Sequence, residues 1–132
     1  MQAIQAYSDQ QFLKFSTVAE AAPNPIAAVH AVLAAVADAK GAMQGCFFVN
    51  SVTELAPHDP SLKAYFQSHI ARVAALVTDL LMQAGFARPP AEDRAGAALA
   101  LAMGLITLRK AGIPARRLQA LLDQVKPLLA LP

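Results

Sequence analysis

The chain has 132 residues and a formal net charge of +2; 56% of its residues are hydrophobic and only 15% are charged. This length suits one domain with a core of its own, and the composition excludes a disordered chain. The small charge excess argues against the basic surface of a nucleic-acid-binding domain. Because alanine is frequent and β-branched and aromatic residues are sparse, we predict an all-α fold, a single domain over residues 1–132.

Proline and glycine divide the chain into about six predicted helices, within which apolar residues recur at spacings of three and four. Pro25, Pro60 and Pro114 stand where a first helical turn tolerates proline, and Gly85 and Gly112 stand where helices end. In chain order, we expect helices over about 2–20, 25–39, 45–56, 60–84, 91–111 and 114–129.

The stretch GCFFVNSVTELAPHDP, residues 45–60, combines an apolar helix with a sharp turn. Pro57 cannot continue the helix, while Asp59 can cap the next helix and Pro60 can occupy its first turn. The single cysteine, Cys46, rules out an internal disulfide and fits a reducing, cytoplasmic compartment.

The predicted fifth helix carries Gly96, Ala100 and Gly104 four residues apart and therefore on one face. A glycine inside a helix costs about 1 kcal/mol relative to alanine. This ridge indicates that another helix backbone approaches closely there. We favour an interface with a second subunit, and the alternative is packing within the monomer.

Several segments together resemble the C-terminal domain of TetR-type transcription regulators. The strongest match is GCFFVNSVTELAPHDPSLKAYF at 45–66, which has the family's Gly-Cys opening, hydrophobic pair, Glu-Leu pair and Asp-Pro loop. AYSDQQFLKF resembles the helix that follows the DNA-binding domain, and NPIAAVHAVLAAV resembles the next one. Residues 91–129 resemble the helix pair that forms a four-helix bundle between two subunits.

The chain departs from this family at its beginning. TetR regulators carry a helix-turn-helix before the connecting helix, whereas Met1 falls within the segment that resembles the connecting helix. We favour a fragment of a repressor, and the alternative is a natural stand-alone effector domain. Operator DNA would then be a partner only through the missing N-terminal domain.

The resemblance implies a small-molecule pocket with the third predicted helix as one wall. Several candidate residues have a structural role as the alternative to a ligand role. Asn50 and Thr53 can bond to neighbouring backbone, Cys46 can be a small buried hydrophobic residue, and a lone His69 can be a hydrogen-bonded residue of the core. Glu54 we expect to pair with His58 or to cap a helix. The ligand-binding candidates are Phe12, Phe15, Cys46, Asn50, Thr53, Phe66 and His69.

The resemblance also implies a homodimer built from the last two predicted helices. A stable interface of this type often buries more than about 2,000 Å². The candidates for this interface are Gly96, Ala100, Leu101, Gly104, Leu105, Leu108, Leu118, Leu121, Leu122 and Val125.

These observations predict the ligand-sensing and dimerisation domain of a TetR-type repressor, with a small hydrophobic effector as partner. The alternative is a purely structural helical dimerisation module with a filled core. We expect no enzyme and no cofactor, because metal-ligand spacings, a nucleophile elbow and a phosphate loop are not found. We expect no membrane partner either, since the apolar run at 95–108 is shorter than a bilayer span.

Overall fold

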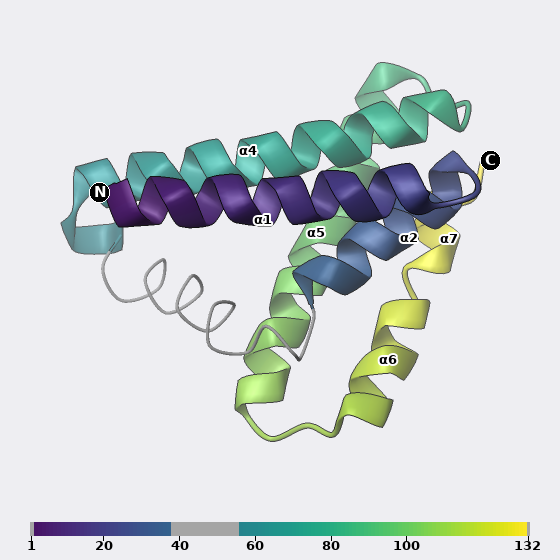
Figure 1. Cartoon of the computed structure of the whole chain (residues 1–132). Helices are drawn as coiled ribbons and strands as arrows, with labels where there is room; N and C mark the ends of the chain where they lie inside the picture. Colours follow the sequence, from purple (N-terminus) through teal and green to yellow (C-terminus); the bar gives the residue numbers. More distant parts are fainter. Residues whose placement is uncertain (1, 38–55, 132) are drawn as a thin grey trace.

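The computed structural model describes residues 2–37 and 56–131, and these residues form helices without a strand (Figure 1). The predicted all-α fold is therefore confirmed. In chain order the elements are α1 (Gln2–Ala21), α2 (Pro25–Val36), the 3-10 helix η3 (Ala56–His58), α4 (Pro60–Gln83), α5 (Arg88–Lys110), α6 (Ala115–Asp123) and α7 (Lys126–Leu129). The predicted helix over 45–56 lies outside the described residues except for Ala56.

Local capping chemistry sets several of the boundaries. Asp59 Oδ1 accepts hydrogen bonds from the backbone amides of Ser61 and Leu62 at 3.0 and 3.2 Å, so its predicted role as the cap of α4 is confirmed. Gly85 (φ 113°) and Gly112 (φ 93°) take left-handed backbone conformations directly after α4 and α5. Glycine reaches that region without steric cost, and both helices stop there as predicted.

Two predicted boundaries are corrected. The fifth predicted helix begins at Arg88 rather than Ala91, because the prolines at 89 and 90 lie in its first turn, where no amide hydrogen is needed. The segment 114–129 is two helices, α6 and α7, rather than one. Pro127 explains the break: it has no amide hydrogen, and its ring clashes with the carbonyl four residues earlier, at Asp123, where α6 ends.

The helices pack around one core. α1 and α4 lie side by side and run in the same direction, while α5 crosses behind them and α6 and α7 return along α5 (Figure 1). Small alanines on the buried side of α5 let it pack closely on α4. The largest fully buried side chains of the core are Val29, Val32, Leu33, Val73, Val77, Leu81 and Val125.

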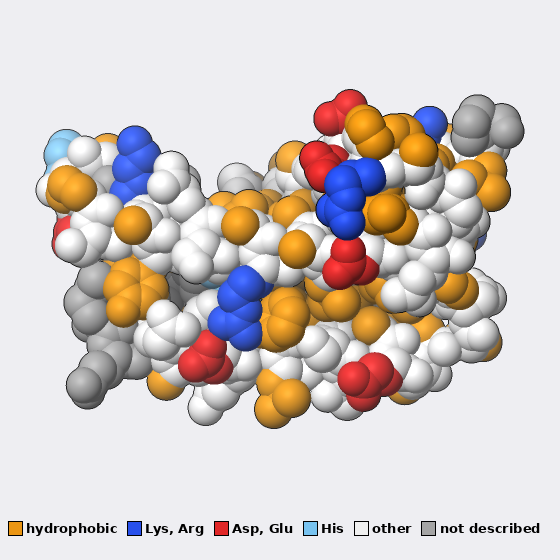
Figure 2. All heavy atoms as spheres, turned by 90° about the horizontal axis from the view of Figure 1, so that it is seen from above, with side chains coloured by type: hydrophobic (Ala, Val, Ile, Leu, Met, Phe, Trp, Pro, Cys, Tyr) orange, Lys and Arg blue, Asp and Glu red, His pale blue; other side chains and the backbone are white. Residues whose placement is uncertain are grey.

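Charged side chains on the face seen in Figure 2 do not gather into one patch. Lys and Arg side chains lie next to Asp and Glu side chains, with hydrophobic side chains between them. This face therefore has no single-sign charge that would attract a polyanion.

Candidate functional site

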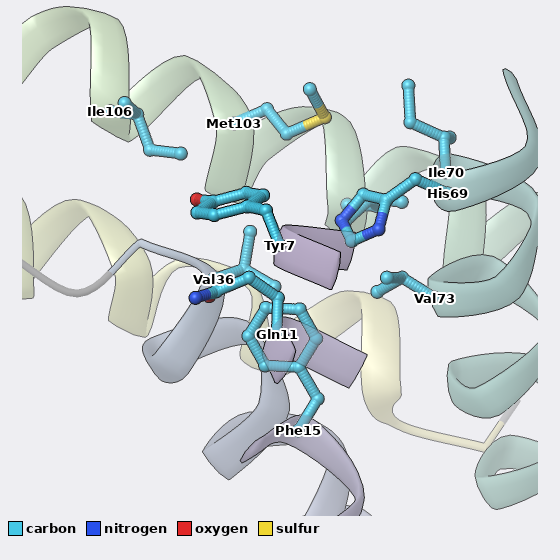
Figure 3. Close-up of a pocket in the computed structure, with 10 residues that line it drawn as sticks. Tyr7, Gln11, Phe15, Val36, His69, Ile70, Val73, Met103 and Ile106 are labelled. Carbon is cyan, nitrogen blue, oxygen red and sulfur yellow. The ribbon is translucent and has the colours of Figure 1, made fainter. Parts of the chain in front are cut away.

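A cavity lies where α1, α2, α4 and α5 meet, and Figure 3 shows side chains from these helices gathered around it. Its volume is about 60 Å³. That is room for a few water molecules, and it is far below the roughly 300–1,000 Å³ of most small-molecule pockets. The described residues that line it are Tyr7, Gln11, Phe15, Val36, His69, Ile70, Val73, Leu99, Met103 and Ile106.

One edge of the cavity is polar and is centred on His69 of α4. Its Nδ1 lies 2.7 Å from the hydroxyl oxygen of Ser8 on α1, which is buried. The hydroxyl donates to Nδ1 or accepts from it according to the histidine tautomer. Burial lowers the pKa of His69 to about 4, and the positive charge of Arg72 acts in the same direction. His69 is therefore neutral near pH 7.

Two further polar side chains, Tyr7 and Gln11 of α1, line the cavity, and Figure 3 shows their polar groups on the side away from the His69 ring. Burial raises the pKa of the Tyr7 phenol to about 12, so the phenol keeps its proton at neutral pH. The lining thus includes a phenol, a carboxamide and a neutral imidazole. These groups can orient a ligand by hydrogen bonds, but none of them offers a charge, so the cavity suits a neutral and mostly apolar compound.

A charged contact joins the same two helices on the outer side of the cavity. Arg72 of α4 donates to Asp9 Oδ1 at 2.8 Å, and its guanidinium carbon lies 4.2 Å from the centre of the Phe12 ring. Gln5 donates to the same carboxylate oxygen at 3.1 Å. These hydrogen bonds, that from Arg72 first, lower the pKa of Asp9. Together with the Ser8–His69 pair, they hold α1 against α4 at one level of the cavity.

The structure brings only part of the predicted ligand-binding set to this cavity. Phe15 and His69 line it. Phe12 lies against Arg72 instead, and the buried Phe66 is not among the lining residues. The remaining candidates, Cys46, Asn50 and Thr53, lie outside the described residues, as does Glu54.

Sequence reasoning missed the polar residues of α1 and the wall that α5 supplies. Tyr7 and Gln11 are four residues apart and precede Phe15 by another four, which places all three along one face of α1. Leu99, Met103 and Ile106 are four and three residues apart, which likewise places them on one face of α5. These spacings are the signal that could have identified both walls.

The predicted interface residues separate into two environments. Gly96, Ala100, Gly104 and Leu108 are exposed on α5, and Leu101 beside them is partly exposed; we call these five residues the outer face of α5. A Cβ atom added at Gly96 or Gly104 would have no heavy atom within 4 Å beyond the helix itself. On α6, Leu121 is partly exposed.

The other predicted interface residues lie inside the chain's own core. They are Leu105, Leu118, Leu122 and Val125, and none of them exposes more than 8% of its surface. Their apolar spacing reflects the packing of α6 and the following turn on α5 within one subunit. An interface through the last helices would therefore be narrower than the sequence suggested.

No metal or membrane element emerges from the described part of the chain. Within residues 2–37 and 56–131, no three His, Cys, Asp or Glu side chains are grouped so that they could hold a metal ion. None of the helices described there is long and apolar enough to cross a membrane.

Comparison with known proteins gives one match. Residues 24–125 match the family model described as the C-terminal domain of LmrA/YxaF-like transcriptional regulators. The matched range runs from the cap of α2 to the turn after α6, so it contains three of the four helices that enclose the cavity. The comparisons with curated proteins and with solved structures gave no match.

Proposed function

The chain belongs to the family of LmrA/YxaF-like transcriptional-regulator C-terminal domains, and from this we propose that it is the effector-sensing and dimerisation part of a TetR-type repressor. Domains of this family are regulatory and in general not enzymatic. The effector would be a small hydrophobic compound that controls DNA binding by a helix-turn-helix domain joined to the start of α1. The protein would act in the bacterial cytoplasm as a homodimer.

The observation that carries the effector role is the apolar cavity with its few neutral polar groups. Nearly all of its lining is hydrocarbon, and in Figure 3 the polar groups of Tyr7 and Gln11 lie on the side away from the His69 ring. A few hydrogen-bonding groups in an apolar surround are typical of small-molecule sites. The volume of about 60 Å³ requires that the helices move apart when a ligand enters.

Such a movement would be transmitted to α1 through the contacts that join α1 to α4. His69 is hydrogen-bonded to Ser8, and one turn further along α4 Arg72 holds Asp9 and Phe12. A ligand that displaces His69 would therefore shift α4 and α1 together. Because a DNA-binding domain would be attached to α1, this is a physical route from the cavity to the operator.

One observation favours the alternative, a structural dimerisation module with a filled core. The cavity is small enough to be an ordinary packing defect, and Phe15, Val73 and Leu99 in its lining are buried. If the core is filled in this way, no compound should enter the cavity and stabilise the fold.

A neutral fluorescent probe, N-phenyl-1-naphthylamine, distinguishes the two functions. We expect saturable fluorescence enhancement and a raised Tm with the parent chain, because the probe is apolar and uncharged. Met103→Trp should abolish both by filling the cavity, whereas Ala75→Trp, at an exposed position of α4, should leave both unchanged. No saturable binding, or equal binding by the two variants, would favour the structural module.

The outer face of α5 supports the dimerisation role. Gly96 and Gly104 have open space around them within the chain, so its own packing does not require glycine at either position. Alanine would be about 1 kcal/mol more favourable in an isolated helix. Close approach of the same helix from a second subunit accounts for both glycines, and Ala100 between them is equally small.

A further inference from the structure

A second concavity lies between α2 and α6, outside the effector cavity. Both helices pack on α5 and make few direct contacts with each other, which leaves a groove of about 290 Å³ over α5. No lining residue is shared with the effector cavity or with the outer face of α5. The lining residues are Ala34, Ala37, Leu105, Ala115, Leu118, Gln119 and Leu122.

Arg109 does not line the groove itself but is bonded to a residue that does. Its Nη1 donates to the backbone oxygen of Ala37 at 3.0 Å, and it follows Leu105 by one helical turn; both of these residues line the groove. Its other terminal nitrogen, Nη2, is buried and has no hydrogen-bond partner, so a ligand in the groove contacts it only when the side chain turns towards the groove. A guanidinium group is permanently charged, so an anionic oxygen is the acceptor that best completes it.

The surrounding charges favour an anion near Arg109. Residues 94–122 contain no Asp or Glu, whereas the exposed Arg116 and Arg117 lie in the first turn of α6, shortly after Arg109 in the sequence. None of the ion pairs between described residues involves Arg109.

Among the described residues, the acidic group nearest to the groove lies at the end opposite to Arg109. Asp123 accepts a hydrogen bond from Gln119 at 3.2 Å and lies 3.6 Å from the ring of His30. Its negative charge would repel an anion. A bound anion would therefore place its charge at Arg109 and direct its apolar part over Leu105, Leu118 and Leu122.

We propose that the groove between α2, α5 and α6 binds a monocarboxylate with a short apolar chain, held by the guanidinium of Arg109. The volume lies at the lower end of the range for small-molecule sites, which limits the chain to a few carbons. This site is separate from the proposed effector cavity, so a test of the site does not depend on the function proposed above.

Hexanoate is the probe that tests the site, with hexanol as the uncharged compound of equal chain length. We expect saturable binding on the order of millimolar, followed by NMR through the methyl groups of Ala37 and Ala115. Arg109→Gln should weaken hexanoate binding about tenfold or more, because it removes the charge-assisted hydrogen bond. Arg88→Gln, which removes an exposed arginine at the start of α5, should leave it unchanged.

A second variant controls for local misfolding in Arg109→Gln, since Arg109 also caps the end of α2. Ala115→Phe fills the groove from an exposed position and leaves Arg109 in place, so it should also weaken hexanoate binding about tenfold. Far-UV circular dichroism checks that each variant remains helical.

Four results would overturn the site. Hexanol could bind as tightly as hexanoate, or Arg109→Gln and Arg88→Gln could weaken binding equally. The shifts could instead appear at the methyl group of Met103, in the effector cavity. Finally, the groove signals could depend on protein concentration without any ligand, which would assign the groove to a second copy of the chain.

Discussion

The two sides of α5 are built from the same kind of small residue but lie in opposite environments. On the inner side the alanines are completely buried, and on the outer face the small residues are exposed. The inner residues are Ala91, Ala95, Ala98 and Ala102, each 0% exposed, and the exposed small residues of the outer face are Gly96, Ala100 and Gly104.

This difference shows that small residues at helical spacing do not by themselves identify a subunit interface. On the inner side the alanines are explained by the neighbouring helices, since α4 and α2 pack against α5. On the outer face no neighbouring atom lies near Gly96 or Gly104. The glycines lower the stability of the helix, and no packing contact within one subunit requires them. Our dimer proposal rests on this contrast.

The largest expected effect is on association, from a charge placed on the outer face. Gly104→Glu should abolish the dimer, because a buried and unpaired carboxylate costs about 3–5 kcal/mol and two-fold symmetry places it in the interface twice. The dissociation constant should rise more than a hundredfold. Analytical ultracentrifugation should show a monomer with undiminished helical circular dichroism, since the space around Gly104 is open in one subunit.

Ala75→Glu is the matched control for this prediction, because it places the same charge on an exposed position of α4. It should leave the oligomeric state unchanged. If Gly104→Glu remains dimeric with the stability of the parent chain, the interface lies elsewhere and the contrast between the two sides of α5 has another cause.

The inner side of α5 should instead control folding. Ala98→Leu inserts three carbons where the side chain is completely buried, and such overpacking typically costs about 1–3 kcal/mol. Urea unfolding should show this loss for Ala98→Leu and less than about 0.5 kcal/mol for Ala75→Leu at the exposed position. An unchanged free energy of unfolding for Ala98→Leu would mean that α5 is less tightly packed on its neighbours than its burial indicates.

The helical fold was predictable because proline, glycine and helix caps act locally. Asp59 and Gly85 mark helix ends through contacts within a few residues, so the sequence alone shows them. The break between α6 and α7 was missed, although Pro127 is an equally local signal.

The assignment of apolar faces was less predictable. Leu118 and Leu122 follow a helical stripe, but a stripe shows only that a face is covered, not whether the cover belongs to the same subunit. The cavity posed the same difficulty: Tyr7 and His69 are far apart in the sequence and meet only because α1 and α4 run side by side in the same direction.

The smallest expected effect is also the most discriminating, because its sign depends on whether the outer face is covered. Gly96→Ala adds one methyl group at a position with no heavy atom within 4 Å in the single chain. If that face stays in water, the variant should gain up to about 1 kcal/mol in unfolding free energy and keep its oligomeric state. If a second α5 approaches closely there, as we propose, the methyl group should instead weaken dimerisation. Ala75→Gly on α4 calibrates the helix-propensity term in this chain, and sedimentation at several protein concentrations separates the two outcomes. A stabilised Gly96→Ala with unchanged dimer affinity would remove Gly96 from the interface.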